Sequence, residues 1–236
     1  MNFCDGCVME DPTRDGCLFR EIKNGQCVNK TANVRQKAAA HENVGYAPDI
    51  KKVEEACQRL LDSLLIDTKT DPNTMETAKR MAKMYVEEAL RGRYISCPDV
   101  KSFPCSEGAY RPYAVGPITV RSLCSHHMVP IVGKVWVVVD PGESVLGLSK
   151  FARLADWIFR RPQIQEQASL QLAELLMEKS GAKGIAVFVK AKHLCMSWRG
   201  VQDEEAEMVT YTFCGSFQET LDLETVAFDL VRAKGF

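Results

Sequence analysis

Long hydrophobic runs are absent from the sequence, and so is an excess of charge of either sign. No segment approaches the roughly 20 consecutive apolar residues that a helix needs to cross a bilayer. The 30 lysines and arginines nearly balance the 31 aspartates and glutamates, for a formal net charge of −1. A balanced chain is not expected to present a long nucleic-acid or membrane surface, although a local basic cluster could still bind a small anion.

The N-terminus lacks the features of a signal peptide. Its first residues, MNFCDGCVMEDPTRDG, are acidic and polar, without the basic and apolar regions that direct secretion. We therefore expect a cytoplasmic protein. In that compartment its ten cysteines are better explained as buried thiols, metal ligands or catalytic groups than as disulfides.

Histidine is scarce, and its distribution is uneven. Of four histidines in the chain, His126 and His127 lie side by side in LCSHHMVP, and His193 lies in KHLCM. Each of these short segments also carries a cysteine, Cys124 in the first and Cys195 in the second. This concentration of metal-binding and proton-transferring side chains predicts a functional site.

The chain divides into three segments by composition. Residues 1–46 are polar, contain few periodic apolar residues and predict an irregular, cysteine-rich extension. Residues 47–112 predict N-terminal helices and a connecting loop. Residues 113–236 contain both cysteine–histidine segments and predict the domain that carries the candidate functional site. A hydrophobic content of 46% is ordinary for a globular protein with a full core.

The middle segment has helical periodicity. Apolar residues recur at spacings of three and four over 53–64 and form one stripe along a predicted helix. A second helix is predicted to begin near Asn73, whose side chain could cap it together with Glu76, and to stop near Gly92. Residues 94–112, with three prolines, predict a loop.

The last segment alternates between strand and helix patterns. One helix is predicted after Ser149 and another over 163–179, with a break at Arg161-Pro162. Runs rich in β-branched residues predict four strands, over 113–123, 129–140, 184–192 and 208–214. This order favours an α+β domain with helices on one face of an antiparallel sheet.

Cys124, His127 and Cys195 offer two thiolates and an imidazole. That ligand set suits zinc and leaves a fourth position for water. Zinc with an open position lowers the pKa of its water towards about 7, so hydroxide becomes available at neutral pH. His126 and His193 would then be free to transfer protons.

A metal site is one of three roles that these cysteines and histidines could have. Free cysteines are often simply buried, and a Cys-x-x-His spacing alone is weak. A cysteine nucleophile with a histidine base is the third role. Spacing alone favours the metal but leaves all three open.

Several longer motifs then identify a resemblance. The segments CSHHMVP, VLGLSKFAR, RRPQIQEQ and AKHLCMSWRGV, at 124–130, 145–153, 160–167 and 191–201, resemble the successive motifs of the GTP cyclohydrolase I family. ETAKRMAKMY, at 76–85, resembles that family's first helix. The match covers roughly residues 50–217 in the family's order and spacing.

The resemblance implies the tunnelling fold, a four-stranded antiparallel sheet with two helices on one face, preceded by an N-terminal helical segment. It also implies that subunits join their sheets into a closed barrel, which removes exposed edges. Members of the family form homo-oligomers, decamers of two pentamers, with active sites between subunits.

The resemblance further implies the reaction. Family members open the imidazole ring of GTP at C8, release formate and form 7,8-dihydroneopterin triphosphate. Matching positions imply zinc bound by Cys124, His127 and Cys195, with His126 and His193 as proton donors and acceptors.

The remaining site residues are carried over in the same way. Glu166 would bind the guanine edge, because a carboxylate can accept from both N1–H and the 2-amino group. Gln165 and Ser149 would lie beside it, Ser149 for the later ribose steps. The triphosphate would be held by Lys150, Arg153 and Arg199, with Arg80 and Lys83 from a neighbouring subunit.

The chain departs from the family pattern in several places. Ser125 replaces the usual glutamate, and Ala78 a frequent proline. Residues 204–207 place acidic groups in a normally hydroxyl-rich segment. These changes bear on rate and substrate range. The alternative functions are a related tunnelling-fold enzyme acting on another purine nucleotide or pterin, and an inactive binding subunit.

The N-terminal cysteines are the largest departure. Four thiolates could hold a structural zinc and fold a segment that has little core. An iron–sulfur cluster, or no metal at all, are the alternatives. The residues of this second metal site would be Cys4, Cys7, Cys17 and Cys27.

Overall fold

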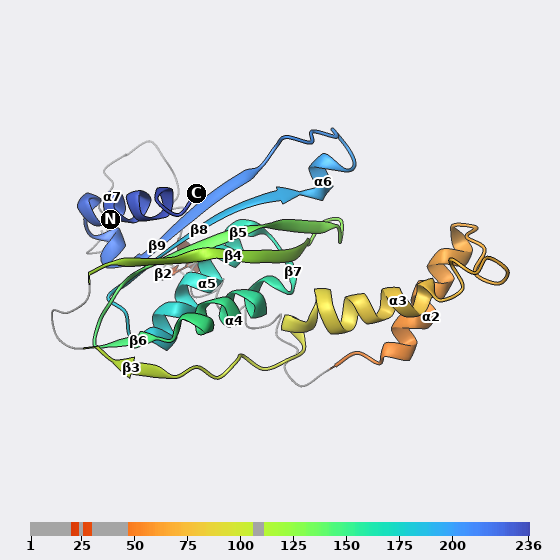
Figure 1. Ribbon diagram of the computed structural model, residues 1–236, viewed down its shortest axis with the longest axis horizontal. Coiled ribbons are helices and arrows are strands. Elements are labelled where there is room, and N and C mark those ends of the chain that lie inside the picture. The colour runs from red at the N-terminus through yellow and green to blue at the C-terminus, as the bar shows by residue number, and fades with distance from the viewer. Residues whose placement is uncertain (1–19, 24–25, 30–46, 106–110) are drawn as a thin grey trace. The chain divides into compact units, whose positions relative to one another are not determined.

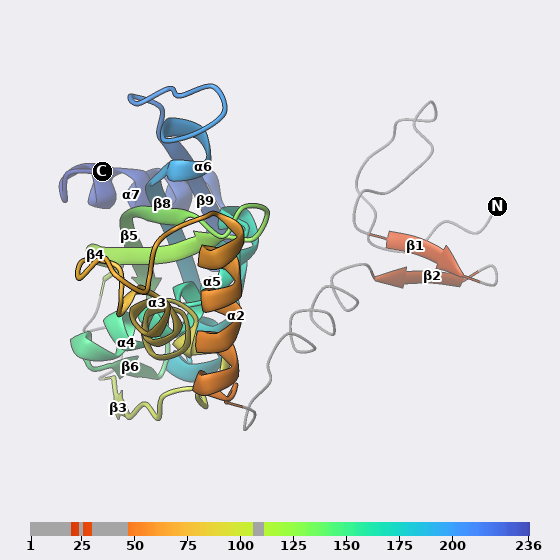
Figure 2. The ribbon, with the colours of Figure 1, turned by 90° about the vertical axis from the view of Figure 1, so that its right-hand side faces the viewer.

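The computed structural model describes residues 20–23, 26–29, 47–105 and 111–236, which belong to two compact units, Met1–Asn43 and Val44–Phe236 (Figure 1). In the first unit, β1 (Arg20–Lys23) and β2 (Gln26–Asn29) form an antiparallel hairpin with Ile22 opposite Cys27 (Figure 2). Cys4, Cys7 and Cys17 lie outside the described residues, so the N-terminal metal site stays a prediction.

The second unit begins with a pair of packed helices. In α2 (Ile50–Ser63), the side chain of Asp49 accepts a hydrogen bond from the Lys51 amide at 3.0 Å and caps the first turn. The predicted apolar stripe is present, and Cys57 and Leu61 bury it against Ala78 of α3 (Thr77–Lys83).

The predicted start of the second helix is wrong. The Asn73 side chain donates to the Asp71 carboxylate at 2.9 Å instead of capping a helix, and residues 72–76 form turns. This local bond stabilises a turn and competes with helix formation. After α3 the helical segment continues as a π-helix, η1 (Met84–Ala89). It ends in a 3₁₀ turn, η2 (Arg91–Arg93).

A sheet with the order β7-β4-β5-β8-β9 forms the centre of the unit. The four predicted strands are present and pair antiparallel, as β4 (Tyr113–Cys124), β5 (Pro130–Asp140), β8 (Gly184–His193) and β9 (Met208–Gly215). The predicted strand number is nevertheless one too low. β7 (Pro162–Gln163) pairs parallel with the end of β4, where a helix was predicted from residue 163.

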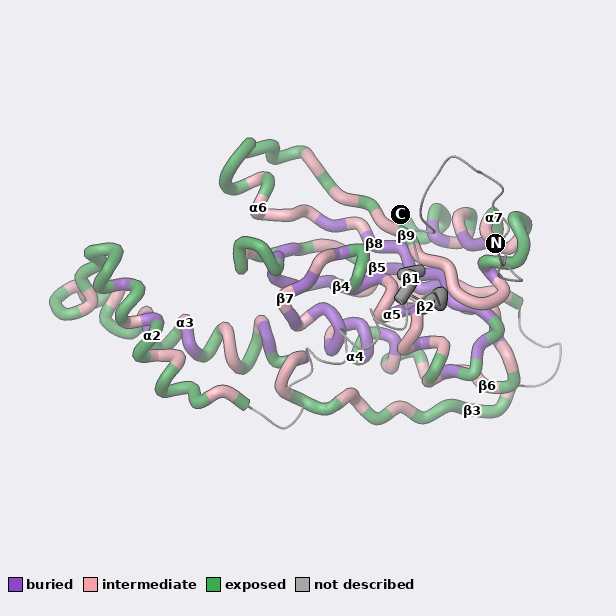
Figure 3. Tube along the Cα trace, turned by 180° about the vertical axis from the view of Figure 1, so that it is seen from behind, coloured by how far each residue is buried: buried purple, intermediate pink, exposed green. Residues whose placement is uncertain are grey.

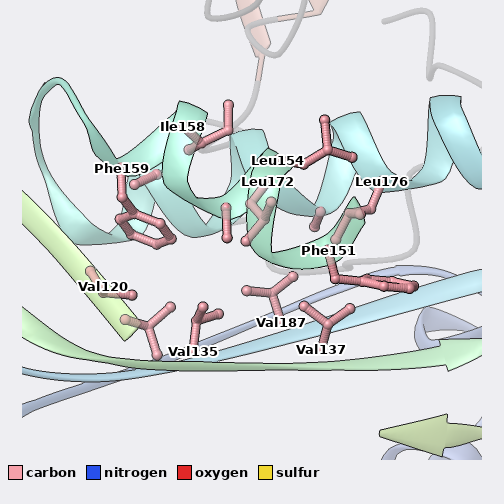
Figure 4. Packing of buried hydrophobic residues seen from close by; sticks show 14 of the residues in the cluster. Val120, Val135, Val137, Phe151, Leu154, Ile158, Phe159, Leu172, Leu176 and Val187 are labelled. Atoms are coloured by element: carbon pink, nitrogen blue, oxygen red, sulfur yellow. The ribbon is translucent and has the colours of Figure 1, made fainter. Parts of the chain in front are cut away.

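Two helices cover one face of the sheet, as predicted. They are α4 (Leu148–Phe159) and α5 (Gln165–Ser180), which ends at Gly181 in the left-handed conformation, φ 65°. Alternate residues of the strands point toward them, because side chains in a strand alternate between faces. Figure 4 shows the resulting core, formed by Val120, Val135, Val137, Val187, Phe151, Leu154, Ile158, Phe159, Leu172 and Leu176.

The opposite face is also partly covered, which the sequence did not predict. After the 3₁₀ turn η3 (Ser216–Gln218), α7 (Leu221–Arg232) packs Ala227 and Val231 against this face. The aromatic side chains of Trp136, Phe188 and Phe217 fill the contact. The expectation of helices on one face only is therefore incomplete.

Shorter elements lie at the ends of the sheet. β3 (Ser102–Pro104), inside the predicted loop, pairs with β6 (Ser144–Leu146), and α6 (Leu194–Ser197) follows β8. Figure 3 shows the buried residues concentrated in the sheet and in α4 and α5. No helix among the described residues is long and apolar enough to cross a membrane.

The core of α4 generates a stability prediction. Phe151 is fully buried under the sheet, whereas Leu148, on the same helix, is 70% exposed. We expect Phe151→Ala to lower the free energy of unfolding by about 3–5 kcal/mol, because the cavity adds to the lost transfer energy. Leu148→Ala should change it by less than about 0.5 kcal/mol. Denaturant titration followed by circular dichroism measures both; equal losses would contradict the assigned core.

Candidate active site

Three potential metal ligands from two strand ends meet at one end of the sheet. Cys124 is the last residue of β4, His127 lies in the turn before β5, and Cys195 lies in α6 just after β8. Their ligand atoms all lie within 4.8 Å of one another, and the Cys124 Sγ is 3.8 Å from the His127 Nδ1. This group could bind a metal ion.

A tight turn places His127 next to Cys124. The Met128 amide donates to the Cys124 carbonyl, and the Cys124 amide donates to the Val129 carbonyl, both at 2.8 Å. Met128 adopts the left-handed conformation, φ 54°, which is unfavourable for a side chain of this kind. The Ser125 amide donates to the Gln163 carbonyl at 3.1 Å, so β7 also holds the turn.

The donor set fits a zinc ion. Burial and the neighbouring Cys124 thiol raise the pKa of the Cys195 thiol, which favours its protonated form without a cation. A bound divalent cation reverses this preference and stabilises the thiolates. In a tetrahedral zinc site a sulfur and a nitrogen ligand lie about 3.6 Å apart. The Cys124 Sγ and the His127 Nδ1 are close to that separation, at 3.8 Å.

His126 lies beside this group but is not part of it. Its side chain is exposed, and its ring meets the His127 ring edge-on, with 6.2 Å between centroids. Arg199 donates from Nη1 to the His127 Nε2 at 3.1 Å. Arg199, which was predicted to bind phosphate, therefore contacts a residue of the metal-binding group in its own chain.

A second group of predicted residues gathers around His193. Its Nε2 is 2.8 Å from the Oε1 of Gln165, the first residue of α5. Burial lowers the pKa of His193, and the carboxylate of Glu166 acts in the opposite direction, which places Glu166 within electrostatic reach. Gln165, Glu166 and His193 therefore lie near one another, and His193 is two residues before Cys195 of the metal-binding group.

Other predicted residues do not reach this end of the sheet. Ser149, Lys150 and Arg153 lie in the first half of α4, which follows β6 at the opposite end of the sheet from α6 (Figure 1). Arg80 and Lys83 are exposed on α3, where Lys83 is 4.0 Å from Glu87. One chain thus brings together only part of the predicted site.

The model of the family described as GTP cyclohydrolase I matches residues 53–232. The chain belongs to the GTP cyclohydrolase I family. A GTP cyclohydrolase 1 of Corynebacterium glutamicum (strain R) is 36% identical over 184 residues, covering 76% of this chain and 93% of the relative.

Further relatives agree with this membership. A GTP cyclohydrolase 1 of Brevibacillus brevis is 33% identical over 78% of this chain and 98% of its own length. A protein of Pseudomonas syringae pv. tomato named GTP cyclohydrolase 1 2 is 38% identical over 67% of this chain and 87% of its own length. A solved apo structure of an archaeosine synthase QueF-Like aligns with TM-score 0.34 and 15% identity, over 51% of this chain and 98% of that chain. An overlap of this quality assigns no shared fold.

Two further residues contact the His193 side of this site and were not predicted from the sequence. Thr210 on β9 and Ser169 on α5 both contact the Gln165 residue, through its side chain and its backbone carbonyl respectively. The alternation of β9 places Thr210 on the side that faces α5, but the sequence does not show which residue it meets there.

The ligand group generates a metal-binding prediction. We expect Cys195→Ser to reduce bound zinc from about one ion per chain to near zero after dialysis, because two remaining ligands bind weakly. Cys214→Ser, on β9 and outside the group, should keep its zinc. Elemental analysis by mass spectrometry measures both variants. Stoichiometric zinc in the Cys195 variant would show that the ion is bound elsewhere.

Proposed function

We propose that this family member is a zinc-dependent GTP cyclohydrolase I, which opens the guanine ring of GTP at C8, releases formate and forms 7,8-dihydroneopterin triphosphate. The observation that carries the proposal is the meeting of Cys124, His127 and Cys195 beside His193 and Glu166. It occurs in a chain that matches the GTP cyclohydrolase I family model over 53–232. We further propose that the α+β unit has the tunnelling fold of that family.

Cys124, His127 and Cys195 would hold the zinc ion. When bound, zinc supplies Lewis acidity that makes water available as a nucleophile near neutral pH. The protein residues around it have separate tasks. Arg199 contacts the His127 Nε2 in the structure. With zinc on Nδ1 that nitrogen would carry a hydrogen and could not accept, so Arg199 would be free to contact the phosphates of a bound nucleotide.

Two histidines would transfer protons. Ring opening builds negative charge on the guanine N7, which a nearby imidazolium can neutralise. His193 is half-buried next to the metal-binding group, whereas His126 is exposed. This difference supports separate roles, with His193 held in one orientation and His126 exchanging protons with solvent.

Glu166 would select guanine. It is exposed in the first turn of α5, directly after the buried Gln165. An ionised carboxylate accepts hydrogen bonds from both N1–H and the 2-amino group of guanine. Adenine has neither of these donors at that edge. Ser149 would act in the later ribose steps.

The triphosphate site would be completed by other subunits. Lys150 and Arg153 lie at the opposite end of the sheet from Cys195, and Arg80 and Lys83 lie on a separate helix pair. A homo-oligomer, in the form of a decamer of two pentamers, would join these groups. Within the chain β9 is an edge strand of the sheet, and a second copy paired with it would remove that exposed edge.

The first prediction of this proposal concerns the reaction. Zinc-loaded protein incubated with GTP should release formate and yield a pterin that fluoresces after oxidation. Glu166→Gln should lower kcat/KM for GTP by about 100-fold or more. The substitution replaces a charged carboxylate, which has two acceptor oxygens, with a neutral amide that has one. Glu174→Gln, later on α5, is the matched control. Zinc-loaded protein without pterin product would overturn the proposal.

The second prediction concerns sharing of the site between subunits. Cys195→Ser and Arg153→Ala should each be nearly inactive alone. Co-expressed in equal amounts, they should recover about a quarter of wild-type activity, because about one interface in four then carries both intact halves. No recovery, with mixed oligomers verified by native mass spectrometry, would mean that each chain uses its own Arg153 and Cys195.

A further inference from the structure

We infer that Thr210 and Ser169 are positioning residues that hold Gln165 in place, and that the Gln165 amide in turn fixes the tautomer and orientation of His193. In this arrangement the His193 Nε2 carries a hydrogen and Nδ1 is the ring nitrogen offered to substrate. The inference rests on the proposed function only where it assigns His193 a part in the reaction. The arrangement itself rests on the contacts of four side chains from α5, β8 and β9.

The Gln165 side chain can adopt only one amide orientation. It is 2% exposed, and its Nε2 lies 3.1 Å from the Met208 carbonyl oxygen and 3.1 Å from the Thr210 Oγ1. The Val189 carbonyl oxygen is also near, at 3.4 Å. Carbonyl oxygens only accept hydrogen bonds, so the NH₂ end of the amide must face β8 and β9. A flipped amide would place its oxygen against two carbonyl oxygens.

The two hydroxyl groups complete a closed set of hydrogen bonds. The Ser169 Oγ donates to the main-chain carbonyl of Gln165 at 2.8 Å. It also lies 3.2 Å from the Thr210 Oγ1. Because Ser169 has used its only hydrogen, Thr210 must donate to Ser169. The Thr210 oxygen is then free to accept from the Gln165 amide. Each hydroxyl donates once and accepts once, as buried polar groups require.

The fixed amide determines the state of His193. The Gln165 Oε1 lies 2.8 Å from the His193 Nε2. This oxygen can only accept a hydrogen bond, so the His193 Nε2 must carry a hydrogen. In the neutral ring Nδ1 then has the free lone pair. Among the described residues, Nδ1 has no hydrogen-bond partner. Thr210 therefore acts on His193 across two hydrogen bonds without touching it.

Thr210→Val tests the inference, because valine keeps the shape of threonine but removes the hydroxyl. We expect it to lower kcat for GTP by about 10–100-fold with little change in KM or bound zinc. Thr210→Ser should restore most of kcat. Thr212→Val, two residues along on the same face of β9, should leave kcat unchanged, since Thr212 makes no side-chain hydrogen bond among the described residues.

A spectroscopic measurement separates this inference from the proposed function. The ¹⁵N spectrum of histidine-labelled protein, with His193 assigned by a His193→Asn variant, reports the ring tautomer whether or not GTP is turned over. We expect an Nε2–H signature in the wild type and in Thr212→Val. In Thr210→Val we expect the same tautomer with a shifted or broadened signal, because the Met208 and Val189 carbonyls still orient the amide after one of its partners is lost. An Nδ1–H signature in the wild type would overturn the inference. So would a Thr210→Val spectrum identical to that of the wild type.

Discussion

The pairing register between β5 and β8 is the constraint on which the site depends. Ile131 pairs with His193, and Val135, Val137, Val187 and Val189 all point into the core beneath α4 and α5. A slip of one residue in β8 would turn Val187 and Val189 to the opposite face and would turn Phe188 into the core beneath α4 and α5. Burial of the valine rows therefore fixes where β8 ends, and with it the position of Cys195 opposite the end of β4.

The same constraint separates the tasks of the site. The strand ends supply the sulfur ligands, while α5, packed on the same face, inserts Gln165 between β8 and β9. A soft cation would hold the thiolates at one side, and a neutral amide holds His193 at the other. The two groups are independent in chemistry but share one scaffold, because both depend on β8 lying against β5 and β9.

The sequence predicted the parts of this arrangement that local patterns encode. Runs of β-branched residues located the four long strands. The concentration of cysteine and histidine in two short segments pointed to Cys124, His127 and Cys195, which the structure brings together. Local patterns failed where a distant partner decides the outcome. β7 exists because Gln163 pairs with Cys124, and Thr210 matters because it meets Gln165, 45 residues away. The burial of Ala227 and Val231 in α7 depends likewise on Trp136 and Phe188.

The separation of Lys150 and Arg153 from Cys195 had no local signal either, because short motifs do not report which chain a neighbour belongs to.

The most direct test of the central claim is an anomalous difference map at the zinc absorption edge from crystals of the zinc-loaded protein. We predict one strong peak bounded by the Cys124 Sγ, the Cys195 Sγ and a His127 ring nitrogen, about 2.0–2.3 Å from each. An ordered structure with zinc bound elsewhere, or with these three side chains turned apart, would contradict the account.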